Sequence, residues 1–263
     1  MTVAGTLAFT LAAAGALGFM ELERYVDSLI LADTARPTFH FVDLPEPLPA
    51  LAGVDLETAV HDINEQLWLS ASVCEEIAKR LERTGWIAGL RHVRRLAGGR
   101  FEIRANYRRP AALVQKGSDF YLVDWEGVRL PGIYMHHPMW KLIQGVAAAP
   151  PPPGEKWASD DLRAGLDVLA ALRGELFAEQ VSAVLVNNHR GRSDPRSAHV
   201  ELGTDRPGGR ILWGSAPGAE VEENAAAQKL TILRENHRRT GRVDAGYLVI
   251  DVSTFPDRFT VPG

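Results

Sequence analysis

Residues 101–108 alternate strictly between apolar and polar side chains. The apolar positions are Phe101, Ile103, Ala105 and Tyr107, and the residues between them are Glu102, Arg104, Asn106 and Arg108. This period of two predicts a strand with one buried and one solvent-facing side. Pro110 cannot donate a hydrogen bond to a sheet, so we expect the pairing of this strand to end there. Two further strands are expected at residues 111–114 and 121–123, on either side of a turn.

Upstream of this strand, the pattern predicts the order β-α-α-β-β for residues 35–110. A first strand is expected around Phe39 and Phe41, and three prolines then break the chain before a helix that Asp55 can cap. A second helix should begin at Ser70 or Ser72 and end at Gly85. The predicted inward residues of the two helices are Leu56, Val60, Ile63, Leu67, Val73, Ile77 and Leu81. Residues 86–96 should then form a hairpin with residues 101–108.

Downstream, residues 111–263 are predicted to form a mixed β-sheet domain with two covering helices, so the fold class is α+β. One helix should begin at Ser159 and run to about Leu172, and the other should begin near Glu222 and end in a basic run at residues 234–242. The residues expected to face the sheet are Leu162, Leu166, Leu169, Ala226, Leu230 and Leu233. Strands are expected at residues 181–186, 198–202, 210–214 and 247–252, followed by an apolar run at 259–261.

Residues 3–20 carry no charge, which just reaches the length that a membrane-spanning helix requires. The strongly apolar residues of this segment are Val3, Leu7, Phe9, Leu11, Leu17 and Phe19. We expect residues 1–34 to form a membrane anchor with a helical extension. A cleaved signal peptide and a buried helix of a soluble protein are the alternatives. No basic residue precedes Arg24, which a true N-terminus upstream of Met1 would explain.

Composition and charge exclude several function classes. An apolar fraction of 46% with 24% charged residues is that of a folded globular protein. The formal net charge is −4 and the basic residues are scattered, so we expect no nucleic-acid partner. The single cysteine, Cys74, excludes an internal disulfide and a multi-cysteine metal site.

The sequence lacks the common catalytic motifs of hydrolases, metalloproteases and P-loop proteins. His136 and His137 are adjacent, and neighbouring side chains on a strand point to opposite faces, which is poor geometry for one metal. Residues 189–192 could bind an anion, but such a polar turn is more typical of a solvated hairpin. Asp160 and Asp161 lie at the start of a predicted helix, where the helix dipole favours carboxylates, and this explains the acidic pair without a catalytic role. We therefore expect no catalytic residue, no metal, no cofactor and no small-molecule substrate.

Several segments, taken in order, resemble the FtsQ/DivIB family of bacterial cell division proteins. They are R-R-P-A-A-L-V at residues 108–114, Y-L-V-D-W-E-G-V at 121–128, H-V-E-L-G at 199–203, G-G-R-I-L-W-G at 208–214, K-L-T-I-L at 229–233 and Y-L-V-I-D-V at 247–252. In that family a small POTRA domain runs into a C-terminal β-domain. The chain departs from the family pattern in a Pro-rich stretch before the first helix and in the missing Arg after I-D, where Val252 and Ser253 stand.

The resemblance implies a non-enzymatic scaffold that connects divisome proteins during septum formation, with FtsB-like and FtsL-like membrane proteins as partners. It also implies a single-pass protein of the inner membrane whose POTRA-like domain and β-domain lie on the periplasmic side. Two other functions remain open at this point. One is a periplasmic cell-wall hydrolase with an unidentified carboxylate pair, and the other is a POTRA-bearing transport or assembly protein.

The expected partner site is the free edge of the C-terminal sheet. An open last strand presents unpaired N–H and C=O groups, to which a partner can add a strand. In the family that the chain resembles, FtsB is recognised in this way at the C-terminal end of the β-domain. The candidate residues, which have high β-propensity, are Tyr247, Val249, Phe259, Thr260 and Val261. The free edge is either residues 247–252 or residues 259–261; alternatively, residues 247–252 are internal and the last residues fray.

Overall fold

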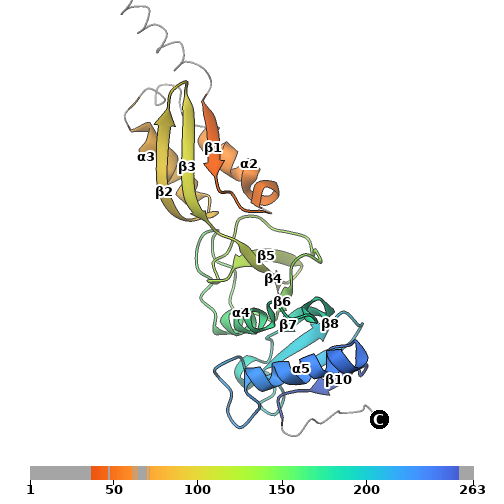
Figure 1. The fold of residues 1–263 in the computed structure, drawn as a ribbon. Coiled ribbons are helices and arrows are strands. Elements are labelled where there is room, and N and C mark those ends of the chain that lie inside the picture. Colours follow the sequence, from red (N-terminus) through yellow and green to blue (C-terminus); the bar gives the residue numbers. More distant parts are fainter. Residues whose placement is uncertain (1–36, 47, 62, 64–69, 71, 255–263) are drawn as a thin grey trace, which may run out of the picture. The chain divides into compact units, whose positions relative to one another are not determined.

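The computed structural model describes residues 37–254, except residues 47, 62, 64–69 and 71. The chain divides into two compact units, Met1–Tyr107 and Arg108–Gly263. This division lies three residues before the boundary that the sequence pattern predicts. Arg108, the first residue of the second unit, forms an ion pair with Asp124 of the same unit. Each unit contains one sheet and two helices among its described residues, so the protein is α+β (Figure 1).

The first unit has the predicted element order. Its elements are β1 (Thr38–Val42), α2 (Leu48–His61), α3 (Val73–Arg83), β2 (Ile87–Leu96) and β3 (Arg100–Tyr107). The three strands form a sheet in the order β1-β3-β2, in which β1 is parallel and β2 is antiparallel to β3. The hairpin between β2 and β3 turns at Gly98 and Gly99, which both have positive φ. The alternation that opens the sequence pattern is therefore the central strand of this sheet.

The start of α2 differs from the prediction. The helix begins at Leu48, seven residues before Asp55, and includes Pro49. A proline in the first turn of a helix is tolerated because the N–H that it lacks has no partner within the helix there. Asp55 therefore does not cap the helix; its carboxylate instead accepts a hydrogen bond from the indole Nε1 of Trp86, at 2.8 Å.

The second helix of this unit, α3, follows the prediction closely. Its buried residues are Val73, Ile77 and Leu81, and Gly85, with φ of +82°, lies just after its end. Ser72 occupies the position before the helix but makes no capping hydrogen bond; its hydroxyl lies 2.7 Å from that of Ser70. The buried face of α3 lies against β2 and supports the sheet.

Among its described residues, the second unit is built on a seven-stranded sheet. Its strands are β4 (Pro110–Lys116), β5 (Asp119–Asp124), β6 (Leu142–Gln144), β7 (Val181–Leu185), β8 (Val200–Thr204), β9 (Arg210–Gly214) and β10 (Val249–Asp251). The helices are α4 (Asp160–Leu172) and α5 (Ala226–Thr240), with short 3₁₀ turns η2 (Ala178–Gln180) and η3 (His189–Gly191). The strand order in the sheet is β10-β9-β8-β7-β6-β4-β5. The strand predicted at residues 111–114 is β4, which begins one residue earlier, at Pro110, and pairs with β5 through a tight turn.

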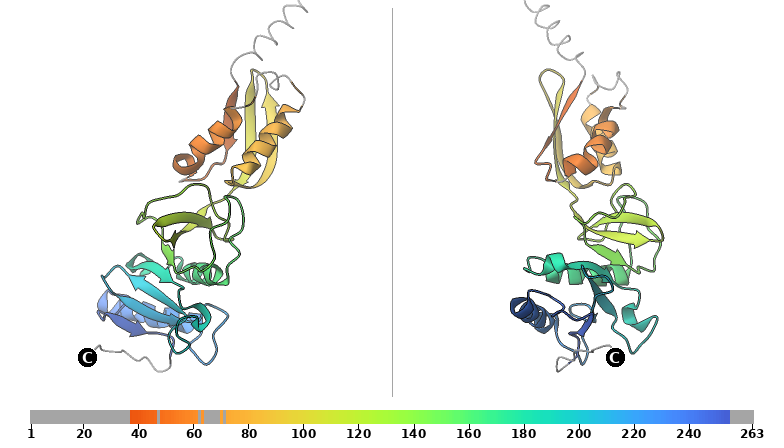
Figure 2. Two further views of the ribbon diagram at one scale, coloured as in Figure 1. Left: turned by 180° about the vertical axis from the view of Figure 1, so that it is seen from behind. Right: turned by 90° about the vertical axis from the view of Figure 1, so that its right-hand side faces the viewer.

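Both helices of this unit cover the same face of the sheet. The connections β6-α4-β7 and β9-α5-β10 each join parallel neighbours, and both step in the same direction across the sheet. Because such crossovers have one handedness, α4 and α5 must lie on one side. One buried cluster accordingly contains residues of both helices, among them Leu166 and Leu233, together with Val184 and Ile250 from the strands. In Figure 1, α5 lies in front of β8 and β10, and in the reverse view of Figure 2 it lies behind them.

Two predicted elements of this unit begin later than expected. The helix expected near Glu222 begins at Ala226, because Glu222 has φ of +56° and the next two residues bond to neighbouring loops. The strand expected at residues 247–252 is limited to Val249–Asp251, because Ala245 and Gly246 have positive φ and the turn that they form holds Tyr247 outside the strand. In α4, by contrast, Leu162, Leu166 and Leu169 are buried as predicted.

The predicted membrane anchor, residues 1–34, lies outside the described residues, and so do all six of its strongly apolar positions. Among the described residues, no helix combines the length and the apolar character that crossing a membrane requires.

Candidate protein-binding edge of the C-terminal sheet

The two edges of the seven-stranded sheet differ in how far they are covered. The outer edge of β5 is bonded by the segment that follows it: Leu130 N donates to Leu122 O and Tyr134 N donates to Phe120 O, both at 2.8 Å. At the other end, β10 pairs with β9 alone among the described residues. The edge formed by β10 is therefore the open one in this part of the chain.

The register of β10 determines which backbone groups face outward. Arg210 N donates to Leu248 O at 2.8 Å, and Val252 N donates to Leu212 O at 3.1 Å. Because backbone groups of a strand point alternately to its two sides, the N–H and C=O of Ile250 must face β9. The N–H and C=O of Val249 and Asp251 consequently face away from the sheet, where an added strand would bond them.

Apolar side chains flank this edge. Tyr247 and Leu248, which precede β10 directly, have exposed fractions of 39% and 40%. They are positioned by a turn in which Tyr247 N donates to Asp244 O and Arg206 donates to Gly246 O. The edge therefore combines outward backbone groups with adjacent apolar surface, the pairing of features that strand-adding sites use for affinity and specificity.

The end of β10 is held by side chains from the loop before α5. Asn224 is buried, and its side-chain nitrogen donates to Val252 O at 3.0 Å and to Thr254 O at 3.1 Å. Its backbone N–H donates to Ser253 O at 2.8 Å. The carboxylate of Asp251 in turn accepts hydrogen bonds from the backbone N–H and the hydroxyl of Ser253. These bonds fix the direction in which the chain leaves the edge strand.

A buried lysine stabilises the same loop. Lys229 of α5 has an exposed fraction of 0%, and its Nζ lies 3.3 Å from a carboxylate oxygen of Glu223 and 3.3 Å from Ser215 O. The same Nζ lies 5.2 Å from the ring centroid of Trp213, within the range of a cation–π interaction. Burial lowers the pKa of Lys229, and the nearby carboxylate of Glu223 acts in the opposite direction. We call Glu223, Asn224 and Lys229 the anchoring network of β10.

The arginines of the predicted anion-binding turn form ion pairs with the two aspartates at the start of α4. Arg190 contacts Asp160 at 3.0 Å, and Arg192 contacts Asp161 at 2.9 Å. Burial alone would raise the pKa of Asp161, but hydrogen bonds from the Ser159 hydroxyl, the backbone N–H of Ala147, Arg192 and the backbone N–H of Leu162 lower it overall. Both guanidinium groups therefore have carboxylate partners within the chain. Through these ion pairs, the turn ties the start of α4 to the end of β7.

His189 in the same turn is expected to make the stability of the folded chain depend on pH. Both of its ring nitrogens are buried without a hydrogen-bond partner among the described residues. Burial and the neighbouring Arg190 lower its pKa, against the weaker effect of Asp161. The unfolded chain, in which histidine has a pKa of about 6.5, therefore binds a proton before the folded chain does. Stability should be complete above that pH and should fall as the pH drops toward the lowered folded pKa.

We expect His189→Leu to reduce this loss of stability on acidification, because leucine keeps most of the volume and cannot take up a proton. The measurement is the free energy of unfolding of the full chain in urea between pH 7.5 and pH 5, approximately, where folded and unfolded histidine differ in charge. His136→Gln, a change at an exposed histidine, is the matched control and should keep the wild-type slope. Equal slopes in all three proteins would show that His189 does not carry the effect.

The structure brings only part of the predicted site together. Tyr247 and Val249 lie at the described edge, whereas Phe259, Thr260 and Val261 lie outside the described residues. The anchoring network was not predicted. Its one signal in the sequence is Lys229, a charged residue among the apolar positions of a predicted helix. No three His, Cys, Asp or Glu side chains lie close enough to hold a metal ion within residues 37–254 as far as these are described.

Neither of the two sequence comparisons returned a relative: no protein-family model matches the chain, and no curated protein is similar to it.

Proposed function

We propose that this protein is a non-enzymatic scaffold of the bacterial division machinery, of the FtsQ/DivIB type, and that it captures a partner protein by strand addition at β10. The observation that carries the proposal is the open edge of β10, where Val249 and Asp251 direct their backbone groups away from the sheet. The order β-α-α-β-β in the first unit supports a POTRA-like domain at residues 35–110. The proposed partners are FtsB-like and FtsL-like membrane proteins.

In this proposal, residues 1–34 anchor the protein in the inner membrane and both units lie on its periplasmic side. The test is a functional fluorescent fusion to the full chain, observed in dividing cells of the source organism. We expect the fusion to gather at division sites, and we expect depletion of the protein to block constriction. An even distribution around the envelope together with normal division would contradict the proposal. Release of fragments from purified peptidoglycan by the purified protein would favour the hydrolase instead.

Val249→Pro tests the strand addition itself. The substitution removes an N–H that faces away from β9, and its ring also obstructs an approaching strand. We expect the affinity for the FtsB-like partner to fall about tenfold or more, equivalent to about 1.4 kcal/mol, with little change in the unfolding midpoint. The measurement is partner binding to the full chain, with urea unfolding in parallel.

Ile250→Pro is the matched control for this change, because the N–H of Ile250 faces β9 and supports the sheet. The unfolding midpoint of this variant should fall. A loss of stability in Ile250→Pro but not in Val249→Pro is the result that the register of β10 requires. Unchanged partner affinity in Val249→Pro, with the chain still folded, would exclude β10 as the added edge.

A further inference from the structure

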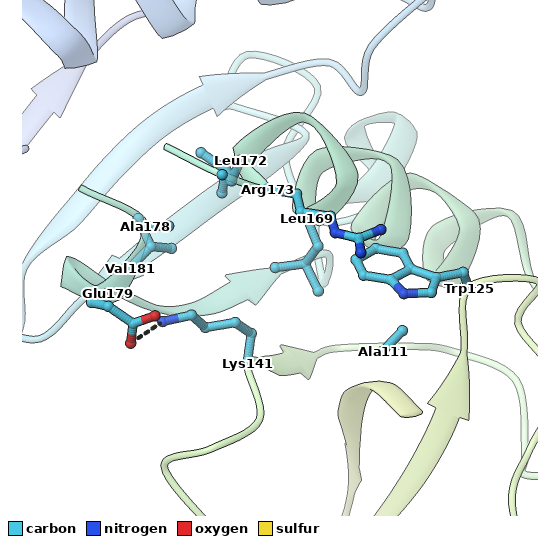
Figure 3. Close-up of a pocket in the computed structure, with 10 residues that line it drawn as sticks. Ala111, Trp125, Lys141, Leu169, Leu172, Arg173, Ala178, Glu179 and Val181 are labelled. Atoms are coloured by element: carbon cyan, nitrogen blue, oxygen red, sulfur yellow. Dashed lines mark hydrogen bonds and ion pairs between the residues drawn. The ribbon is translucent and has the colours of Figure 1, made fainter. Parts of the chain in front are cut away.

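A second candidate binding site lies on the C-terminal unit, away from β10. A cavity of about 220 Å³ opens between the end of α4, the η2 turn and the turn after β5. Its lining residues are Ala111, Trp125, Lys141, Leu169, Leu172, Arg173, Gly174, Ala178, Glu179 and Val181 (Figure 3). Most of these side chains are apolar, and we call this cavity the Trp125 pocket.

The walls of the Trp125 pocket are held in place by the fold. Leu169, Leu172 and Val181 are buried and belong to the main core. Trp125 lies in a turn fixed by the buried carboxylate of Asp124, which accepts hydrogen bonds from the backbone N–H of Glu126 at 2.9 Å and of Val128 at 2.8 Å. The other oxygen of that carboxylate accepts a hydrogen bond from Arg108 at 2.8 Å. The pocket is thus preformed, which reduces the entropic cost of binding.

The rim of the pocket carries an excess of positive charge. At one end, the guanidinium carbon of Arg173 lies 5.5 Å from the ring centroid of Trp125, and Arg173 makes no ion pair with any described residue. At the other end, Lys141 lies 3.5 Å from the carboxylate of Glu179. Figure 3 shows these two charged groups on opposite sides of Leu169. Two cations face one carboxylate, so an incoming carboxylate has a place beside Arg173.

The size of the pocket indicates what it can hold. Pockets for whole small-molecule ligands have volumes of about 300–1,000 Å³, and this one is smaller. Its volume suits one large apolar side chain, as in the central pockets of protein interfaces. Leu176, with an exposed fraction of 90%, lies two residues beyond Gly174 and adds exposed apolar surface near the pocket. Apolar depth with a cationic rim fits a segment in which carboxylates flank an apolar residue.

We propose that the Trp125 pocket binds an acidic segment of a partner protein, whose apolar side chain enters the pocket while a neighbouring carboxylate bonds to Arg173. The inference rests on the proposed scaffold function only in taking the ligand to be a protein segment. It does not depend on strand addition at β10, because none of the ten lining residues belongs to β9, α5 or β10.

Fluorine NMR of the full chain, with fluorotryptophan in place of its six tryptophans, tests the proposal directly. The probe is the acetylated and amidated peptide GSEFESG, compared with GSQFQSG and GSEAESG. We expect GSEFESG to shift the Trp125 signal, which Trp125→Phe identifies, and to leave the signal of the buried Trp213 unchanged. The affinity for each comparison peptide should be lower by about fivefold or more, since each peptide lacks either the carboxylates or the apolar anchor.

Arg173→Gln should remove the preference for GSEFESG over GSQFQSG. Arg196→Gln is the matched control, because Arg196 is an exposed arginine of the same unit that makes no ion pair with any described residue and does not line the pocket. This variant should keep the preference. The proposal is overturned if GSEFESG does not shift the Trp125 signal, or if both glutamine variants keep the same preference. Because no division protein is used, these outcomes are separate from those of the partner-binding test at β10.

Discussion

Lys229→Ala should lower the free energy of unfolding of the C-terminal unit by about 3–5 kcal/mol, because removing one partner of a buried ion pair leaves the other charge uncompensated. The side chain of Lys229 is fully buried, and its partner Glu223 is 11% exposed. The substitution also removes the methylene groups that pack in the interior and the cation beside the ring of Trp213. The measurement is urea unfolding of the full chain, monitored by tryptophan fluorescence.

The double variant Lys229→Met with Glu223→Gln separates charge from packing. Methionine keeps most of the lysine volume, and glutamine can still accept the hydrogen bond that Glu223 receives from the backbone N–H of Ser215, at 2.9 Å. Replacing both members of a buried ion pair by neutral groups is often tolerated, so this variant should recover much of the stability lost in Lys229→Ala. A loss below about 1 kcal/mol in Lys229→Ala would show that the anchoring network does not stabilise the unit.

Gly145→Ala should have a comparable effect, a loss of about 2–5 kcal/mol, which combines the cost of a left-handed backbone with that of overpacking. Gly145 has φ of +88°, and a Cβ there would lie 2.5 Å from the backbone nitrogen of Asn187. The two segments cannot separate easily, because Val186 N donates to Gln144 O and Arg192 donates to Gly145 O. The free energy of unfolding in urea is again the quantity to measure.

Gly117→Ala is the control for the conformational part of this cost. Gly117 has φ of +62°, and a Cβ there would have no neighbouring atom within 4 Å. It should lose only about 1–2 kcal/mol, the cost of a left-handed backbone without a clash. Equal losses at the two glycines would contradict the close approach of residues 145 and 187.

The sequence pattern predicts the elements whose signals are local. Three such signals are the alternation around Ile103, the glycine turn before β3 and the apolar stripe of α4. The residues that make up each signal lie close together in the sequence, and all three elements appear in the structure. The start of α2 is predicted wrongly, because Pro49 indicates a break by pattern and yet occupies a first helical turn where it is tolerated. Local signals therefore identify an element more reliably than they locate its ends.

The candidate sites depend on contacts between distant residues, which the pattern does not contain. Lys229 contacts Ser215 and Trp213 from the preceding strand and its following loop, so its burial follows from the crossover between β9 and β10. The Trp125 pocket similarly joins residues as far apart in the sequence as Ala111 and Val181, and no local pattern indicates that they meet. Among the described residues β10 lies at the end of the sheet, which is where a strand with high β-propensity was expected. The choice between residues 247–252 and 259–261 as the free edge stays a prediction, because residues 255–263 lie outside the described residues.

From β6 onward, the strands lie in the sheet in the same order as in the chain. In the arrangement that we propose, a chain that folds from its N-terminal side as it emerges in the periplasm can therefore add each of these strands to the one before it. The edge that we propose as the partner site is then the last one to form, after β9 and α5 are in place. Recruitment at β10 would report that β9 and α5 are already in place, so chains that have not yet folded this far would not compete for the partner.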